Sequence, residues 1–347
     1  MKINYIILFI NILATLFLLY LYLVNNSKTS LDTKVVSVET PLNKYTIENL
    51  SHVKLNNYDI VATTTIENDN YTSLIFSFEF NPDFDSTDTK ITTGLINIPK
   101  SQGEVNKFPL IIMIRGYVDP GNYETGTGTK NAGYYFAEHG FITLAPDFLG
   151  YAGSDINATD IFESRFQTYT TVLALISKLG DPQFMKLINN TWDQKNIFIW
   201  AHSNGGQIAL TVLTAQGYTF PTSLWAPVTK PFPYSILYYT DESEDGGKFI
   251  RRKLSDFEHL YNTDLFSFTN YLDNLHAPLM IHQGTNDNAV PKSWNDSFVI
   301  NLNNLDKEVE YHTYPNANHN LQPFWDEVVE KDVMFFTSHL IDKDHLF

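Results

Sequence analysis

Residues 196–206 read N-I-F-I-W-A-H-S-N-G-G. The apolar run 197–200 predicts a buried strand, and residues 207–213 favour a helix. Ser203 therefore lies at a sharp turn between a strand and a helix, where its hydroxyl projects out of the packing. The small residues around it, Ala201, Gly205 and Gly206, leave room for the helix to cross close to the strand. This arrangement is typical of a serine nucleophile.

The turn departs from the usual G-x-S-x-G pattern at one position, where Ala201 replaces the first glycine. Alanine has the next smallest side chain, so the motif is weakened only slightly. The alternative is that Ser203 belongs to an ordinary glycine-rich turn. The strand before it and the helix after it favour the nucleophile, because the helix N-terminus also stabilises negative charge on a bound substrate.

Composition excludes several classes of protein. The 347 residues are enough for one large α/β domain or two small ones, and a hydrophobic content of 43% supplies a core. A net charge of −16 argues against nucleic acid as a partner, because phosphates need a basic surface. The sequence has no cysteine, which excludes disulfides and thiolate catalysis and is more typical of a secreted bacterial protein than of a eukaryotic one. It also has no H-E-x-x-H motif or close histidine pair, so we expect neither a metal nor another cofactor.

The N-terminus carries a nearly continuous apolar run at residues 3–24, preceded by Lys2. A membrane-spanning helix needs about 20 such residues, and the preceding positive charge favours an N-terminus inside the cell. We therefore expect an uncleaved signal anchor with the catalytic domain outside the cytoplasm. The alternative is a cleaved signal peptide, although no A-x-A cleavage site follows the run.

The rest of the chain alternates between predicted strands and predicted helices. Residues 71–80 and 90–99 alternate apolar and polar side chains and predict an antiparallel pair. Buried strands are predicted at residues 109–114, 141–145, 223–226, 278–282 and 309–314, and helices at 129–139, 159–179 and 324–340. This order predicts a doubly wound, mostly parallel α/β sheet with antiparallel N-terminal strands. Residues 227–275 form a long insertion between two strands, which we interpret as a cap.

Two loops supply partners for Ser203. A serine hydroxyl needs a histidine to take its proton and a carboxylate to hold that histidine in the right tautomer. Asp287 follows the strand at 278–282, and His319 follows the strand at 309–314. With ten histidines and thirty-nine acidic residues, a serine, an acid and a histidine must occur in that order somewhere in the chain. What distinguishes Asp287 and His319 is that each follows a predicted buried strand. His202 and His282 lie in or beside strands and are predicted to be packing residues.

The negatively charged oxygen formed by serine attack needs two backbone N–H donors. We predict that Asn204, directly after the nucleophile, supplies one. Tyr117, in the Arg115-Gly116-Tyr117 loop after the strand at 109–114, is predicted to supply the other. The alternative is that Tyr117 only packs at the rim of the site.

Five segments together resemble the catalytic domain of the prolyl oligopeptidase family, which is close to the dienelactone hydrolase-like esterases. They are I-R-G-Y at 114–117, G-F-I-T-L-A-P-D-F-L-G-Y-A-G-S-D at 140–155, the turn at 196–206, A-P-L-M-I-H-Q-G-T-N-D-N-A-V-P at 277–291 and Y-P-N-A-N-H-N at 314–320. The resemblance extends from residue 90 to the C-terminus. It implies an α/β-hydrolase fold, a triad of Ser203, Asp287 and His319, and an oxyanion hole at Tyr117 and Asn204.

The resemblance has two departures. Arg115-Gly116 stands where many relatives have His-Gly, and the residues before the hydrolase domain are too few for the β-propeller that restricts larger members to short peptides. Peptide specificity therefore does not carry over. We expect a serine hydrolase that cleaves a peptide amide or an ester in a small substrate. The alternatives are a carboxylesterase without peptidase action and a catalytically silent binding module.

The expected organisation is an anchor and linker start at residues 1–28, an N-terminal arm at 29–68 and a hydrolase domain at 69–347. Substrate contacts are predicted for Arg115 and for three cap residues, Tyr234, Tyr238 and Tyr239. The alternative for the cap aromatics is that they form only the core of the cap.

Overall fold

A computed structural model of the chain describes residues 15–22, 39–53, 59–84, 88–101, 106–240 and 243–341. The chain divides into two compact units, residues 1–40 and 41–347. Residues 15–22 of the predicted anchor are helical, whereas residues 3–14, 23 and 24 lie outside the described part. No helix within the described ranges is both long enough and apolar enough to cross a membrane.

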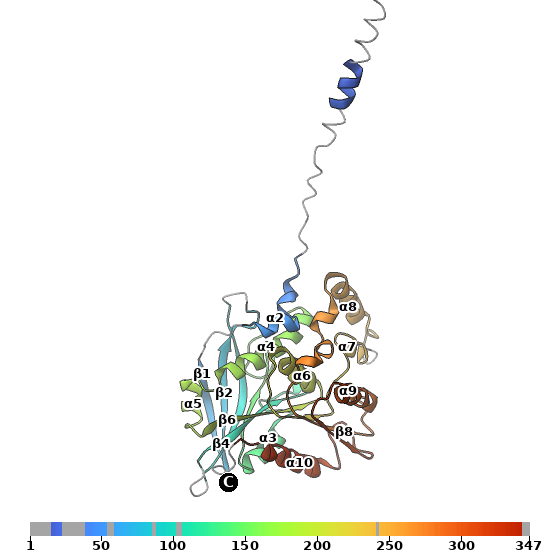
Figure 1. The fold of residues 1–347 in the computed structure, drawn as a ribbon. Helices are drawn as coiled ribbons and strands as arrows, with labels where there is room; N and C mark the ends of the chain where they lie inside the picture. The colour runs from blue at the N-terminus through green and yellow to red at the C-terminus, as the bar shows by residue number, and fades with distance from the viewer. Residues whose placement is uncertain are drawn as a thin grey trace, which may run out of the picture. The chain divides into compact units, whose positions relative to one another are not determined.

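The larger unit is built on a nine-stranded sheet in the order β1-β2-β3-β5-β4-β6-β7-β8-β9 (Figure 1). The first strands, β1 to β3, pair antiparallel, and β3 pairs antiparallel with β5. All later pairs are parallel. The strands are β1 (Ile60–Glu67), β2 (Tyr71–Phe80), β3 (Lys90–Pro99), β4 (Phe108–Ile114), β5 (Ile142–Pro146), β6 (Trp192–His202), β7 (Thr222–Trp225), β8 (Leu279–Gly284) and β9 (Val309–Tyr314). The predicted α/β-hydrolase fold is confirmed.

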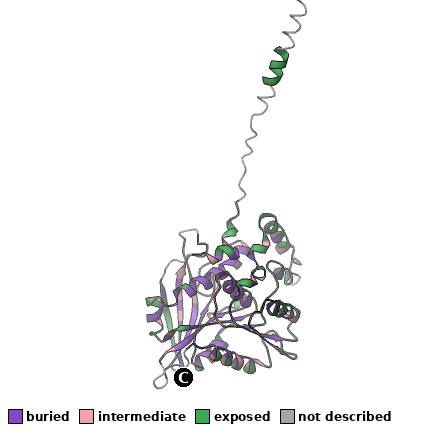
Figure 2. Ribbon diagram, viewed as in Figure 1, coloured by how far each residue is buried: buried purple, intermediate pink, exposed green. Residues whose placement is uncertain are grey.

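The sheet separates two cores, as β4 illustrates. All seven of its residues are buried. Leu110, Ile112 and Ile114 belong to one core, and Ile111 and Met113 to the other, because successive side chains of a strand point to opposite faces. Burial runs along the centre of the sheet and the inner faces of the helices (Figure 2). A strand buried on both faces explains the continuous apolar run in the sequence.

Helices cover both faces of the sheet (Figure 1). On one face, α3 (Lys130–Glu138) and α10 (Trp325–Ser338) bury Phe136 against Phe336, with ring centroids 5.8 Å apart. On the other face lie α4 (Ile161–Lys178) and α6 (Asn204–Gln216). Asp160 caps α4 by accepting from the backbone N–H groups of residues 162 and 163. These four helices lie where the sequence predicts them.

In its described part, the insertion between β7 and β8 contains α7 (Tyr234–Leu237), α8 (Lys248–Leu260) and the short 3-10 helices η4 (Thr263–Phe266), η5 (Phe268–Asn270) and η6 (Leu272–Asn274). Phe232 and Phe257 are buried in an aromatic cluster. Their partners on α4 are Phe162, whose ring centroid lies 4.6 Å from that of Phe257, and Phe166, whose ring centroid lies 5.3 Å from that of Phe232. The insertion is therefore fixed to the α4 side of the sheet, and Phe232 belongs to its core.

The stretch predicted as an N-terminal arm contains η1 (Pro41–Tyr45), α2 (Ile47–Ser51) and the edge strand β1. Tyr45 is fully buried, and its ring packs at a tilt against that of Phe166 of α4, with centroids 5.3 Å apart. The carbonyl of Leu50 accepts from Gln216 at the end of α6. The domain boundary near residue 68 stays a prediction, and β1 pairs with β2 across it.

Candidate active site

Ser203 joins β6 to α6, as the sequence predicts. Its φ is +56° and its ψ −123°, a conformation that costs a side-chain-bearing residue energy and persists only where neighbours hold it. Its N–H donates to the Trp225 carbonyl at 2.8 Å, and its carbonyl accepts from Gly206 and Val228, each at 3.0 Å. Three backbone hydrogen bonds therefore hold Ser203 in this strained conformation.

Glycines around the turn allow backbone segments to approach closely. A Cβ on Gly205 would lie 2.1 Å from the Ile114 carbonyl oxygen, and a Cβ on Gly116 would lie 2.9 Å from the Cβ of Ser203. Neither contact is possible for a real side chain, so both positions require glycine. The loop after β4 thus packs directly against the nucleophile turn.

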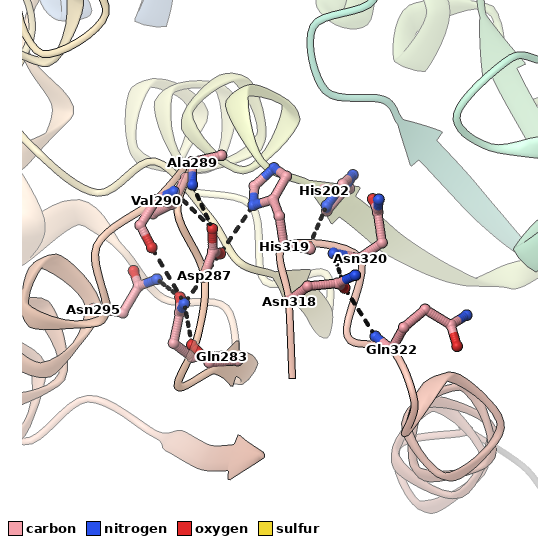
Figure 3. Close-up of polar contacts among 11 residues, drawn as sticks. His202, Gln283, Asp287, Ala289, Val290, Asn295, Asn318, His319, Asn320 and Gln322 are labelled. Atoms are coloured by element: carbon pink, nitrogen blue, oxygen red, sulfur yellow. Dashed lines mark hydrogen bonds and ion pairs between the residues drawn. The ribbon is translucent and has the colours of Figure 1, made fainter. Parts of the chain in front are cut away.

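Asp287 and His319 lie on the loops after β8 and β9, and the structure brings them together (Figure 3). His319 Nδ1 lies 2.9 Å from Asp287 Oδ2. A carboxylate only accepts, so Nδ1 carries a proton in this bond and Nε2 is the ring nitrogen left free of it. The Asp287 side chain is fully buried, whereas that of His319 is 22% exposed.

The electrostatic environment keeps Asp287 ionised. Burial raises the pKa of its carboxyl, but the hydrogen bond and charge of His319, with the N–H groups of Val290 and Ala289, outweigh burial and hold that pKa below its usual value. The two N–H groups donate to Oδ1 at 2.8 and 2.9 Å. Asp287 is therefore a fixed acceptor for the His319 ring.

A chain of buried amides supports Asp287, and the sequence analysis missed it (Figure 3). Gln283 on β8 donates to Asp287 Oδ2 at 3.2 Å and accepts from Asn295 at 2.5 Å. Asn295 lies on α9 (Lys292–Asn304) and accepts in turn from Thr229 at 2.8 Å. The Gln283 and Asn295 side chains are fully buried, so each bond is protected from water. The start of the insertion is thereby linked to the acid.

His202, predicted to be a packing residue, also contacts His319. Its Nε2 lies 3.0 Å from the His319 carbonyl oxygen, which must be the acceptor, and the two ring centroids are 4.7 Å apart. Desolvation, with the neighbouring His319 ring, lowers the pKa of His202 to about 4. His202 is therefore neutral at pH 7 and holds the backbone of His319. The position of His202 directly before Ser203 was the only feature of the sequence that pointed to its place in the site.

His282 has a structural role, consistent with the packing prediction. It is fully buried, and its Nε2 donates to Asp332 Oδ1 at 3.0 Å. Asp332, on α10, also accepts from Ser223 and, at 2.8 Å, from Trp225 Nε1. This network ties α10 to β7 and β8. Across the described ranges, no cluster of three or more metal-ligating side chains occurs.

Arg115 is 4% exposed and lies among aromatic rings, 3.9 Å from the ring centroid of Tyr151 and 4.6 Å from that of Tyr123. Its Nη1 donates to the Gly116 carbonyl at 2.9 Å and its Nη2 to the Asp147 carbonyl at 2.8 Å. In a trans peptide the C=O and N–H point in opposite directions. The bond to Gly116 therefore turns the Tyr117 N–H away from Arg115.

The predicted oxyanion donors have no competing acceptor. Among the residues that the structure describes, neither the Tyr117 N–H nor the Asn204 N–H has a hydrogen-bond partner. Tyr117 as a whole residue is 74% exposed. The oxyanion role of both residues stays a prediction.

The cap tyrosines lie on the surface. Tyr234, Tyr238 and Tyr239 are 36% to 45% exposed, and the Tyr238 ring packs 4.9 Å from that of Trp294 on α9. A cavity of about 240 Å³ instead lies beside the nucleophile turn, and its lining includes Arg115 but none of these three. Substrate contact by Arg115 and the tyrosines stays a prediction.

The sheet, the strained serine turn and the hydrogen-bonded acid–histidine pair define an α/β-hydrolase of the serine hydrolase class. A sequence model of the prolyl oligopeptidase family matches residues 129–342, which is more than half of the chain. The chain therefore belongs to the prolyl oligopeptidase family and is a serine hydrolase. No curated protein matches the sequence.

Several solved structures are similar. An acetyl xylan esterase from Paenibacillus sp. R4 is 16% identical, with a TM-score of 0.61 over 86% of this chain and 95% of that one. Acetyl xylan esterase 1 from Thermoanaerobacterium sp. is 16% identical, with a TM-score of 0.52 over 85% and 92%. A putative dipeptidyl aminopeptidase IV from Bacteroides ovatus is 16% identical, with a TM-score of 0.52 over 88% of this chain. This chain spans 38% of the length of that aminopeptidase. At these identities the likeness concerns the fold alone.

Proposed function

We propose that the protein hydrolyses an ester or a peptide amide bond through an acyl-enzyme on Ser203, with His319 as the base and Asp287 as the acid of the triad. The observation that carries this proposal is the 2.9 Å hydrogen bond between His319 Nδ1 and Asp287 Oδ2. It leaves Nε2 of His319 as the basic nitrogen on the loop edge that also carries the serine turn.

The proposed reaction has two halves. Ser203 Oγ attacks the carbonyl carbon while His319 Nε2 takes its proton, and the N–H groups of Tyr117 and Asn204 receive the negative oxygen. The bond to the leaving group breaks, and His319 returns the proton to the departing alcohol or amine. Water then attacks the acyl-enzyme by the same route, which releases the acid and restores Ser203.

Both kinds of bond remain in the proposal. The similar structures include acetyl xylan esterases and a putative dipeptidyl aminopeptidase. The cavity beside the turn, at about 240 Å³, is smaller than most ligand pockets, which span roughly 300–1,000 Å³. This size supports a short acyl group and favours small esters as the first substrates to test.

Activity profiling with a fluorophosphonate probe tests the proposal. The wild-type protein should be labelled, whereas Ser203→Ala should not be labelled and should lose turnover by several orders of magnitude, because triad members act as a unit. Ser293→Ala, at an exposed serine on α9, is the matched control and should label normally. Labelling that survives in Ser203→Ala would place the nucleophile elsewhere. A panel of p-nitrophenyl esters and dipeptidyl anilides then separates esterase from peptidase action.

Membrane anchoring through residues 3–24 is a second part of the proposal. It is supported by the length and apolar character of that run in the sequence. The full-length chain should remain with membranes during alkaline carbonate extraction, and a chain that starts at residue 30 should be released and active. A mature N-terminus near residue 25 in the native host would identify a cleaved signal peptide instead.

A further inference from the structure

The cavity of about 240 Å³ beside the nucleophile turn is lined by residues of the loop after β4, the loop after β5, α4 and α6. Tyr117 and Asn204, which carry the proposed oxyanion donors, and Gly116, which lies beside Ser203, form one part of the wall. Arg165 of α4 forms another part. The sequence analysis attached no role to Arg165.

The charge of Arg165 has no anionic partner in the described part of the chain. Its Nη2 donates to two neutral oxygens, Asn204 Oδ1 at 2.8 Å and Gln207 Oε1. A guanidinium carries five N–H donors, so the two on Nη1 and the one on Nε remain. The Nε atom is buried without a partner. A partly buried cation held only by amides is costly, and an incoming anion removes that cost.

The other residues around the cavity also favour the binding of an anion. The lining contains two arginines, Arg115 and Arg165, and no aspartate or glutamate. This composition stands out in a chain with a net charge of −16. The N-terminus of α6, at Asn204, also presents its positive end to the cavity wall.

The position of the cavity indicates which part of a substrate enters it. In the proposed reaction His319 gives its proton to the leaving group, so the leaving group lies toward His319. Neither His319 nor Asp287 lines the cavity, whereas the proposed oxyanion residues do. A carbonyl oxygen in the oxyanion hole is attached to the acyl carbon. The substituent on that carbon therefore points into the cavity.

We propose that Arg165 binds a carboxylate on the acyl group, so that the preferred substrates are short esters or amides whose acyl chain ends in a negative charge. This inference rests on the proposed serine hydrolase function and adds the substrate class. Arg165 acts here as a specificity-determining residue. The free Nη1 N–H groups of the guanidinium pair with the carboxylate, and the apolar lining, such as Ile161 and Ile208, packs on the connecting carbons.

The test compares two esters that differ in charge and share chain length, monoethyl glutarate and ethyl pentanoate. In the wild type, kcat/KM should be higher for the glutarate ester by roughly 10- to 100-fold, as a charge-assisted pair provides. In Arg165→Gln this ratio should fall toward one, and in Arg165→Lys it should recover in part. Because the ratio compares two substrates of the same variant, a general loss of activity cancels out of it. The ratio in wild type should also fall as salt increases.

Arg252→Gln is the matched control, since it removes the same charge from an exposed residue on α8 that does not line the cavity. If Arg165→Gln does not fold, competitive inhibition of the wild type by glutarate, but not by pentanoate, supplies the same evidence. A wild-type ratio of one or below overturns the inference, as does an unchanged ratio in folded Arg165→Gln. Preference for 4-acetoxybenzoate over phenyl acetate, with no glutarate preference, would place the anion on the leaving group and also overturn it. Each result leaves the Ser203→Ala labelling test to judge the hydrolase function separately.

Discussion

Arg115→Met tests whether Arg115 orients the peptide group between Gly116 and Tyr117, whose N–H is a predicted oxyanion donor. Methionine has a similar length and an apolar side chain that can pack among the rings of Tyr123 and Tyr151. It cannot donate a hydrogen bond. The carbonyls of Gly116 and Asp147, which accept from Arg115 at 2.9 and 2.8 Å, would lose their donor.

The expected magnitudes follow from these two bonds. An unsatisfied buried acceptor costs about 1–3 kcal/mol, and removal of the buried charge offsets part of that cost. We therefore expect a net loss of stability of about 1–3 kcal/mol. Without the bond to Gly116, the peptide that carries the Tyr117 N–H is free to rotate. Loss of one oxyanion donor lowers kcat by roughly 100- to 1,000-fold, and KM should change little, because the donor acts on the transition state.

The assay measures kcat and KM on p-nitrophenyl acetate, with thermal unfolding to establish that the variant folds. Arg252→Met, at an exposed arginine of α8, is the control for removal of a positive charge. A folded Arg115→Met protein with kcat within about threefold of wild type would refute the orienting role. A raised KM with unchanged kcat would instead assign Arg115 to substrate binding, as the sequence analysis predicted.

Three further predictions concern the histidines and their partners. Asp287→Asn should fold but lower kcat by roughly 10,000-fold, because an amide favours the wrong tautomer of His319, and near-normal turnover would contradict the triad. The pKa of His202 is about 4 in the folded protein and 6.5 for a free side chain. Between these two pH values the unfolded chain binds more protons than the folded protein. The stability of the fold should therefore decrease as the pH is lowered from 6.5 to 4. The ring is partly exposed, so we expect a contribution of about 1–2 kcal/mol, seen in urea unfolding as a weaker pH dependence in His202→Gln. Asp332→Leu should lower stability by about 2–4 kcal/mol while sparing kcat, since it leaves three buried donors of β7 and β8 without their acceptor. An unchanged urea midpoint would show that this network does not stabilise the fold.

The parallel part of the fold was predictable because its strands are buried on both faces and read as continuous apolar runs. The edge strand β1 was not, since only Ile60 of its eight residues is buried and the remaining seven give no apolar alternation. Helix α9 was missed because it is rich in asparagine and serine, which are weak helix formers. Its existence depends on tertiary packing of Phe298 and Leu302.

The candidate site also contains residues that the sequence could predict and residues that it could not. Ser203, Asp287 and His319 each follow a strand, so their positions could be read from the chain. The supporting amides could not, because Gln283 and Asn295 acquire their role only when β8 and α9 meet. Arg165 lies within a helix and meets α6 only in three dimensions.

A Cβ at Gly205 would clash with the Ile114 carbonyl, and one at Gly116 would clash with Ser203, so the Ser203 turn and the loop after β4 form one closely packed block. If Ser203 and the N–H groups of Tyr117 and Asn204 act as proposed, this packing sets the spacing between the attacking oxygen and those N–H groups before any substrate binds. New substrate preferences must then arise in the walls around this block, in the insertion and in the cavity-lining part of α4. A library randomised at Gly205 should return only glycine among active clones, whereas one randomised at Arg165 should return active enzymes with altered selectivity.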